Sequence, residues 1–384
     1  MFQERNHLSE EMRNAGWILI FILAATWCGC STLARPEDIG VVIARRAEVR
    51  SSTAVVAADM LEVRRGDVLD ILDSTTVQET GEKWLRVRAR DTDNTEGWVE
   101  ARNVMPEALL DRSRQIAKED ANIPAQADGQ LRAGTNLRYS PDRSTNDNIL
   151  LKLDSGAKFQ IVGWKRVARP KSSEAAESDD TPKAGAAQQA TGRRKAESEA
   201  AKVPEEMYEL WYRVRLPKSI SPAPAGWVYG RQVELTVPGD IIFYRTGREF
   251  VAWERLDDEP GGSGVSNDAR DADPPTPESQ PGSWVILEKS STDESSRPDE
   301  PDFDRIFVLG YDKSKQEHYT AYRGPDIKGR LPLRVEGHGD SKIFTVGVQD
   351  GAQVREVQFR AYKDDKGILK VEALNNPARS GRKR

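Results

Sequence analysis

The sequence predicts a mainly β protein: two small modules of short antiparallel strands, then a larger antiparallel β sandwich or barrel domain, with disordered inserts. Three observations lead to this fold class. A pattern of tryptophan, arginine and glycine occurs twice within residues 45–235, and turn signals divide residues 236–375 into short apolar segments. Between the two copies of the pattern, residues 106–119 have the composition of a single short helix.

The repeat is clearest around its tryptophans. Trp84–Arg88 reads Trp-Leu-Arg-Val-Arg and precedes Gly97–Val99, Gly-Trp-Val. Trp211–Arg215 reads Trp-Tyr-Arg-Val-Arg and precedes Gly226–Val228, again Gly-Trp-Val. Upstream of each pentapeptide, apolar and polar residues alternate after a glycine, which is the period of a half-buried strand. Each copy is therefore expected to be a small all-β module.

The order of these motifs resembles the bacterial SH3 (SH3b) family. Units of that family open on a motif like Asn136–Pro141, Asn-Leu-Arg-Tyr-Ser-Pro, and close on Gly-Trp-Val. The first copy is degenerate at its opening, Glu48–Ser52, and lacks the proline. The resemblance spans residues 45–105 and 130–235 apart from an insert, and it implies two tandem barrels of about five or six strands each. In many members of the family such units bind cell-wall or peptide ligands.

An uninterrupted apolar run at residues 17–27 ends at Cys28-Gly29-Cys30. A membrane-spanning helix needs about 20 apolar residues, so this run has the length of a signal-peptide core instead. Cys30 follows a small residue, as a bacterial lipoprotein cleavage site requires. The sequence therefore predicts Cys30 as the lipid-attachment site and first mature residue, with the membrane as a partner through that lipid.

Two features of the sequence near Cys30 depart from the usual pattern of a lipoprotein signal. Trp27 stands where such sites usually carry an aliphatic residue, and acidic residues precede the apolar run unless translation starts at Met12. An uncleaved anchor or an ordinary secretory signal is the alternative interpretation. Ser31 is not aspartate, which by resemblance to lipoproteins favours sorting to the outer membrane. We expect a protein of the bacterial cell envelope, lipid-anchored and facing the periplasm.

Composition divides the chain into successive segments. These are a signal peptide (1–29), a tether (30–44), the first module (45–105), a helical linker (106–129), the second module (130–235), an antiparallel β domain (236–375) and a basic tail (376–384). Three polar inserts cannot bury enough apolar surface to offset the entropy of ordering them, and they are expected to be disordered: 169–204, 257–282 and 290–301.

The domain after residue 235 has no counterpart in the repeat. Its apolar stretches are 240–245, 249–256, 283–288, 305–311, 318–323, 331–336, 342–348, 354–362 and 367–371. Glycine- and aspartate-rich turn signals separate them. Short strands at this spacing indicate an antiparallel meander, folded as a sandwich or as a closed barrel.

The residue inventory argues against most catalytic chemistries. The chain has two cysteines, of which Cys28 leaves with the signal and Cys30 is blocked by lipid. The mature histidines, His318 and His338, match no strong metal motif, and only carboxylates near them would complete a site: Glu317, Glu336 and Asp340. We predict no catalytic residue, no metal and no cofactor, and hence no enzyme. The net charge of −5 also argues against a nucleic-acid partner.

The Trp-led strands offer the candidate ligand-binding surface. If alternate aliphatic residues face the core, each tryptophan shares the opposite face with two arginines, which can stack on indole and bind carboxylates. The competing interpretation is that the indoles serve packing. The candidate residues are Trp84, Arg86, Arg88, Trp211, Arg213, Arg215 and Tyr139.

Three functions remain open on these grounds. The first is a non-enzymatic, lipid-anchored envelope protein that binds peptidoglycan or a protein partner through its two modules. The second is an envelope hydrolase with its active site in residues 236–384 and the modules for targeting. The third is a structural or assembly lipoprotein in which the modules are spacers.

Overall fold

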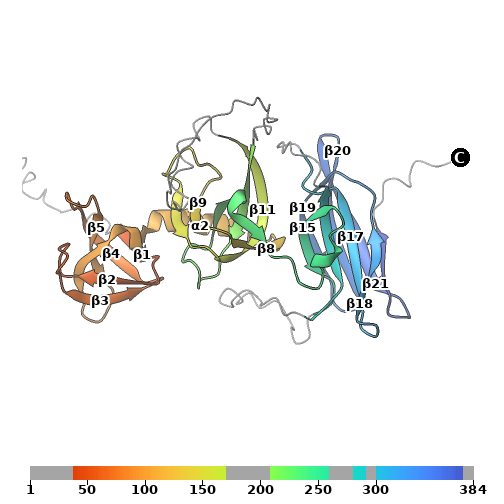
Figure 1. Cartoon of the computed structure of the whole chain (residues 1–384), viewed down its shortest axis with the longest axis horizontal. Helices are drawn as coiled ribbons and strands as arrows, with labels where there is room; N and C mark the ends of the chain where they lie inside the picture. Colours follow the sequence, from red (N-terminus) through yellow and green to blue (C-terminus); the bar gives the residue numbers. More distant parts are fainter. Residues whose placement is uncertain (1–37, 170–207, 259–279, 291–299, 375–384) are drawn as a thin grey trace, which may run out of the picture. The chain divides into compact units, whose positions relative to one another are not determined.

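The computed structural model describes residues 38–169, 208–258, 280–290 and 300–374. Within these residues the protein is mainly β with antiparallel sheets, which confirms the predicted fold class (Figure 1). The chain forms two compact units, residues 1–107 and 108–384. The predicted signal peptide with Cys30, the basic tail and most of each of the three predicted inserts (169–204, 257–282 and 290–301) lie outside the described residues.

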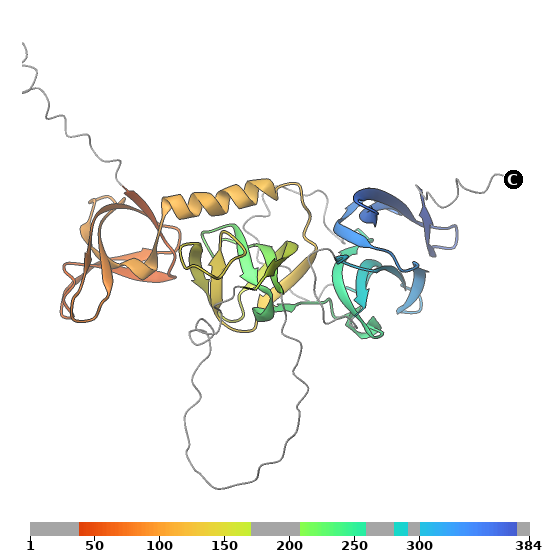
Figure 2. The same ribbon diagram turned by 90° about the horizontal axis from the view of Figure 1, so that it is seen from above.

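The first unit contains one antiparallel sheet of seven strands, named module 1 here, in the order β3-β2-β6-β5-β4-β1-β7. The sheet curls round on itself (Figure 2). Its aliphatic core includes Val49, Val87 and Val99, each fully buried. The module starts at β1, upstream of the boundary expected at residue 45, because β1 pairs with both β4 and β7. Its elements are β1 (Asp38–Val42), β2 (Arg46–Arg50), β3 (Asp59–Arg64), β4 (Val68–Thr76), β5 (Lys83–Ala89), β6 (Glu96–Glu100), the 3-10 helix η1 (Ala101–Asn103) and β7 (Val104–Pro106).

The first sheet of the second unit, module 2, has the strand order β10-β9-β13-β12-β11-β8-β14. This is the order of module 1 strand for strand, so the sequence repeat corresponds to two sheets of the same topology. The glycines that precede β4 and β11 both adopt a left-handed backbone, with φ of 93° at Gly66 and 78° at Gly156. The elements are β8 (Ala127–Leu131), β9 (Thr135–Arg138), β10 (Ile149–Leu153), β11 (Lys158–Ala168), β12 (Tyr208–Arg215), β13 (Ala225–Tyr229), η3 (Gly230–Gln232) and β14 (Val233–Leu235).

The helix expected at residues 106–119 is present as α2 (Glu107–Glu119). Its buried side chains, Leu110, Ser113 and Ile116, recur every three residues and so lie on one face. Ser113 accepts a hydrogen bond of 3.0 Å from the backbone N–H of Ala225 in β13. The helix therefore packs on module 2.

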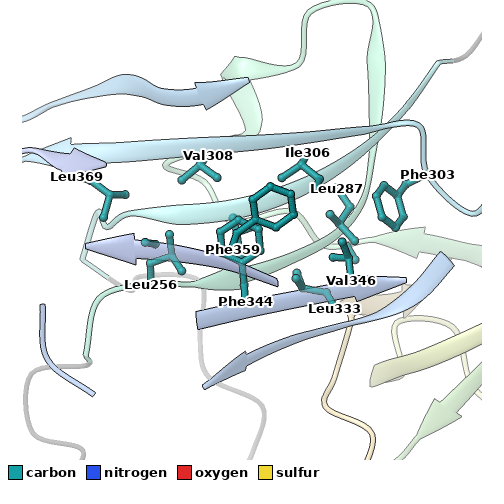
Figure 3. Close-up of a cluster of buried hydrophobic side chains, with 13 residues drawn as sticks. Leu256, Leu287, Phe303, Ile306, Val308, Leu333, Phe344, Val346, Phe359 and Leu369 are labelled. Atoms are coloured by element: carbon teal, nitrogen blue, oxygen red, sulfur yellow. The ribbon is translucent and has the colours of Figure 1, made fainter. Parts of the chain in front are cut away.

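The remainder of the second unit is a sandwich of two four-stranded meanders, β15-β16-β17-β18 and β19-β20-β21-β22. One apolar core contains side chains from both sheets, and the rings of Phe344 and Phe359 stack in it at 4.9 Å (Figure 3). The predicted strand at 240–245 is instead a 3-10 turn, because the carbonyl of Pro238 accepts the N–H groups of Ile241 and Ile242. The elements are η4 (Ile242–Tyr244), β15 (Arg248–Arg255), β16 (Trp284–Ser290), β17 (Arg305–Asp312), β18 (Glu317–Arg323), β19 (Gly329–Glu336), β20 (Ser341–Asp350), β21 (Gln353–Lys363) and β22 (Leu369–Ala373).

Gln126 joins module 2 to the sandwich. Its side-chain amide donates to the carbonyl of Leu333 at 3.0 Å and accepts from the N–H of Leu333 at 2.6 Å. Its own carbonyl accepts the N–H of Trp253 at 3.0 Å. Gln126 is 1% exposed, so these bonds are shielded from water. The residue lies in the segment expected to be a helical linker, yet it fixes the contact between two β structures.

Candidate binding surface

The two tryptophans predicted to stack on a ligand are buried. Trp84 is 4% exposed and Trp211 is 1% exposed. The guanidinium of Arg50 lies 5.9 Å from the ring of Trp84, and the ring of Tyr229 lies 5.6 Å from that of Trp211. Both indoles therefore contribute packing in this structure, and neither has an open face on which a ligand could stack.

The arginines beside Trp84 are paired within module 1. Arg86 and Arg88 lie 3.0 Å and 2.8 Å from the two carboxylate oxygens of Glu96, on the neighbouring strand β6. The hydrogen bond from Arg88 holds the pKa of Glu96 below its ordinary value. Pairs this exposed contribute little to stability, but they compensate the positive charge of this face.

The arginines beside Trp211 bind the end of helix α2. Arg213 donates to Asp120 at 2.7 Å and to the carbonyl of Ile116 at 3.3 Å, and Arg215 donates to the carbonyl of Asp120 at 3.0 Å. Cations are favourable at a helix C-terminus, where carbonyl groups lack helical partners. Burial raises the pKa of Asp120 and the charge of Arg213 partly offsets this. The face predicted to bind a ligand in module 2 is thus occupied by the protein's own helix.

Tyr139 remains half-buried at the end of β9, and the exposed guanidinium of Arg112 lies 5.5 Å from its ring. The backbone N–H of Tyr139 donates to the carbonyl of Asn148, which fixes the start of the following loop. Of the seven residues predicted to bind a ligand, Tyr139 is the aromatic side chain that stays partly accessible, and its binding role stays a prediction.

A more exposed surface lies in the loop between β2 and β3 of module 1, residues 51–58, which we call the apolar loop. Val55 and Val56 at its tip are 91% and 94% exposed. Arg50 donates to the carbonyls of Val55 at 2.8 Å and Ala57 at 3.1 Å, and the N–H of Ala58 donates to the Ser51 hydroxyl at 3.1 Å. These bonds brace the loop, so two adjacent valines are presented to solvent on an ordered turn.

The equivalent loop of module 2, residues 139–148, begins with Tyr139 and is otherwise mostly polar, with charged side chains at Asp142, Arg143 and Asp147. Arg138 occupies the place of Arg50 and donates to the carbonyl of Thr145 at 2.7 Å. Arg143 forms a well-buried pair with Glu209 at 2.6 Å, which ties the loop to β12. The two modules therefore brace this loop in the same way and differ in what it presents. In the sequence this loop is marked by the uncharged run at residues 51–58, whereas the repeat is most conspicuous at its tryptophans.

The contacts of His318 indicate a structural role. His318 is bonded to the carbonyl of Gly282 at 2.8 Å and lies 3.5 Å from a carboxylate oxygen of Asp240. The rings of Tyr244 and Tyr311 flank it. His338 is exposed. Among the described residues no three histidine, cysteine, aspartate or glutamate side chains gather to hold a metal ion.

Comparison of the chain with models of known protein families gives no match, and comparison with curated protein sequences gives no significant relative. The resemblance to the bacterial SH3 family therefore rests on the motifs in the sequence. In the part of the chain that the structure describes, every helix is too short or too polar to cross a bilayer.

Proposed function

We propose that this chain is a non-enzymatic, lipid-anchored protein of the bacterial cell envelope that binds a protein partner through module 1. Both modules are proposed to be SH3b-like units. The observation that carries the partner site is the braced apolar loop with its two exposed valines.

The anchor is proposed from the sequence. An apolar run of signal-peptide length ends at Cys30, which is proposed to carry the lipid. Module 1 follows Cys30 closely, since β1 begins at Asp38, so the lipid would keep this module near the membrane surface. Labelling with a radioactive fatty acid tests the anchor: Cys30→Ser is expected to abolish incorporation, and retained label would refute Cys30 as the site.

The chemistry of the apolar loop favours a protein over a glycan or an ionic polymer. Residues 51–58 carry no charge, and the side chains at the tip offer neither hydrogen bonds nor an aromatic face for a sugar ring. Two exposed aliphatic side chains gain most from insertion into an apolar pocket on another protein, where each buried valine contributes about 1.5–3 kcal/mol. Bracing reduces the entropy lost when the loop is immobilised.

Site-specific photo-crosslinking in intact cells tests this function. A benzophenone amino acid at Val56 is expected to give a discrete protein adduct. The same probe at Asp147, an exposed position in the equivalent loop of module 2, is expected not to give that adduct.

Arg50→Ala, which removes the brace, is expected to weaken the adduct formed at Val56. A probe at Val56 that crosslinks only to lipid would contradict a protein partner and point to the membrane. An identical adduct from both positions would contradict a site in the apolar loop.

A further inference from the structure

A half-open cavity of about 190 Å³ lies where module 2 meets the sandwich, inside the second unit. Four of its lining residues are aliphatic or proline: Ile123, Val162, Leu331 and Pro332. The double hydrogen bond of Gln126 to Leu333 fixes the two structures that form it.

Two polar groups face each other across this junction. The indole N–H of Trp164 in β11 donates to a carboxylate oxygen of Asp302 at 3.1 Å, and the N–H of Leu331 donates to the other oxygen at 3.1 Å. The ring of Tyr212 meets that of Trp164 edge-on at 6.2 Å and holds its orientation. The cavity therefore has an aromatic wall and a positioned hydrogen-bond acceptor before any ligand arrives.

The charge of Asp302 is already compensated. A guanidinium nitrogen of Arg330 lies 3.8 Å from the carboxylate oxygen that accepts from Trp164. Each carboxylate oxygen can accept more than one hydrogen bond, so both retain capacity for a further donor. Asp302 and Arg330 together carry no net charge, so a cationic or an anionic ligand would lose hydration on entering the cavity without gaining a net attraction. A neutral hydroxyl donor fits best.

Gly163 of module 2 lines the cavity, and its counterpart in module 1 is a different residue. The strands β11 and β12 change register between Ile161 and Gly163, as β4 and β5 do between Ile71 and Asp73. At this bulge module 1 carries an aspartate, where module 2 has glycine. A Cβ atom built on Gly163 meets no atom within 4 Å, so the missing side chain leaves open space next to Trp164.

We infer that this cavity binds one ring of a neutral saccharide. The C–H face of the sugar lies against the Trp164 indole and the aliphatic wall, and a ring hydroxyl donates to Asp302. This site contains no residue of module 1, so the test of saccharide binding can fail or succeed independently of the test of the protein partner proposed above. Together the two sites would let one chain hold a glycan and a protein.

Ligand-observed NMR on the full chain carrying Cys30→Ser tests the inference with three probes: N-acetylglucosamine, protonated glucosamine and glucuronate. We expect N-acetylglucosamine to bind with a Kd of about 1–10 mM and the two charged sugars to bind more weakly. Gly163→Val fills the cavity and is expected to raise the Kd by at least about tenfold. The matched control is Gly239→Val, since Gly239 also has nothing within 4 Å of its Cβ position and lies outside the cavity.

No binding of N-acetylglucosamine at about 50 mM would overturn the inference, as would unchanged binding in Gly163→Val. Glucosamine binding more tightly than N-acetylglucosamine would refute the neutral ligand. If Gly163→Val fails to fold by circular dichroism, Asp302→Asn takes its place. Asp302→Asn keeps the shape of the side chain, and the inference requires that this variant bind N-acetylglucosamine more weakly.

Discussion

Replacing Gln126 by alanine removes the amide that joins module 2 to the sandwich. Leu333 is 2% exposed, and it would lose the partners of both its N–H and its carbonyl. A buried backbone group left without a partner costs about 1–3 kcal/mol. Some relaxation is expected at the new space, so Gln126→Ala should destabilise the second unit by about 2–4 kcal/mol.

Gln130→Ala is the matched control, because Gln130 lies four residues further on and its amide reaches only an exposed Glu234 at 3.3 Å. The control should cost less than about 0.5 kcal/mol. Urea unfolding followed by tryptophan fluorescence measures both variants, and hydrogen exchange at the amides of Trp253 and Leu333 locates the loss. Equal destabilisation by the two variants, or unchanged exchange at Leu333 in Gln126→Ala, would refute this account of the junction.

Three further predictions concern buried polar and aromatic groups. Glu288 is fully buried and neither of its carboxylate oxygens is hydrogen-bonded. Burial raises its pKa and nearby arginines offset this only in part, so ionisation costs stability as pH rises through the folded pKa. The Tm of Glu288→Gln minus the Tm of the wild type should therefore increase as pH rises from about 4 to 8. Parallel curves of Tm against pH would contradict this. Trp211→Ala should cost about 3–5 kcal/mol in denaturant unfolding, because it empties a buried site, and a loss below about 1 kcal/mol would argue that the indole is not core. Arg213→Ala leaves Asp120 buried without its cation and should cost about 3 kcal/mol with loss of helical circular dichroism, whereas Arg86→Ala, at an exposed pair, should leave the spectrum unchanged.

Local patterns predicted most of the strands. Turn glycines such as Gly337 and Gly351 have positive φ, and strands begin and end at the hairpins they mark. The repeat likewise predicted two modules, since Gly66 and Gly156 play the same backbone role. Turns and strands of this kind depend on residues close together in the sequence, so they can be predicted from one sequence alone.

The binding surface depends on contacts between distant residues, which alternation along one strand does not encode. Period-2 alternation predicts Trp84 and Leu85 on opposite faces of the strand. Both side chains are nevertheless buried, and the guanidinium of Arg50 lies 5.9 Å from the indole ring. In the same way, Arg213 is paired with Asp120, 93 residues upstream. The apolar loop is visible in the sequence as an uncharged run, but its bracing by Arg50 and the exposure of its tip are properties of the folded module.

The most direct test of the proposed function is the affinity of the purified chain for the protein that crosslinks at position 56. The double variant Val55→Ser/Val56→Ser removes the apolar tip and leaves the Arg50 hydrogen bonds to backbone carbonyls in place. If each substitution loses the about 1.5–3 kcal/mol that a buried valine contributes, the Kd rises by at least about 100-fold. Unchanged melting of module 1 together with that rise is the result we predict, and a Kd within about twofold of wild type would contradict the proposed partner site.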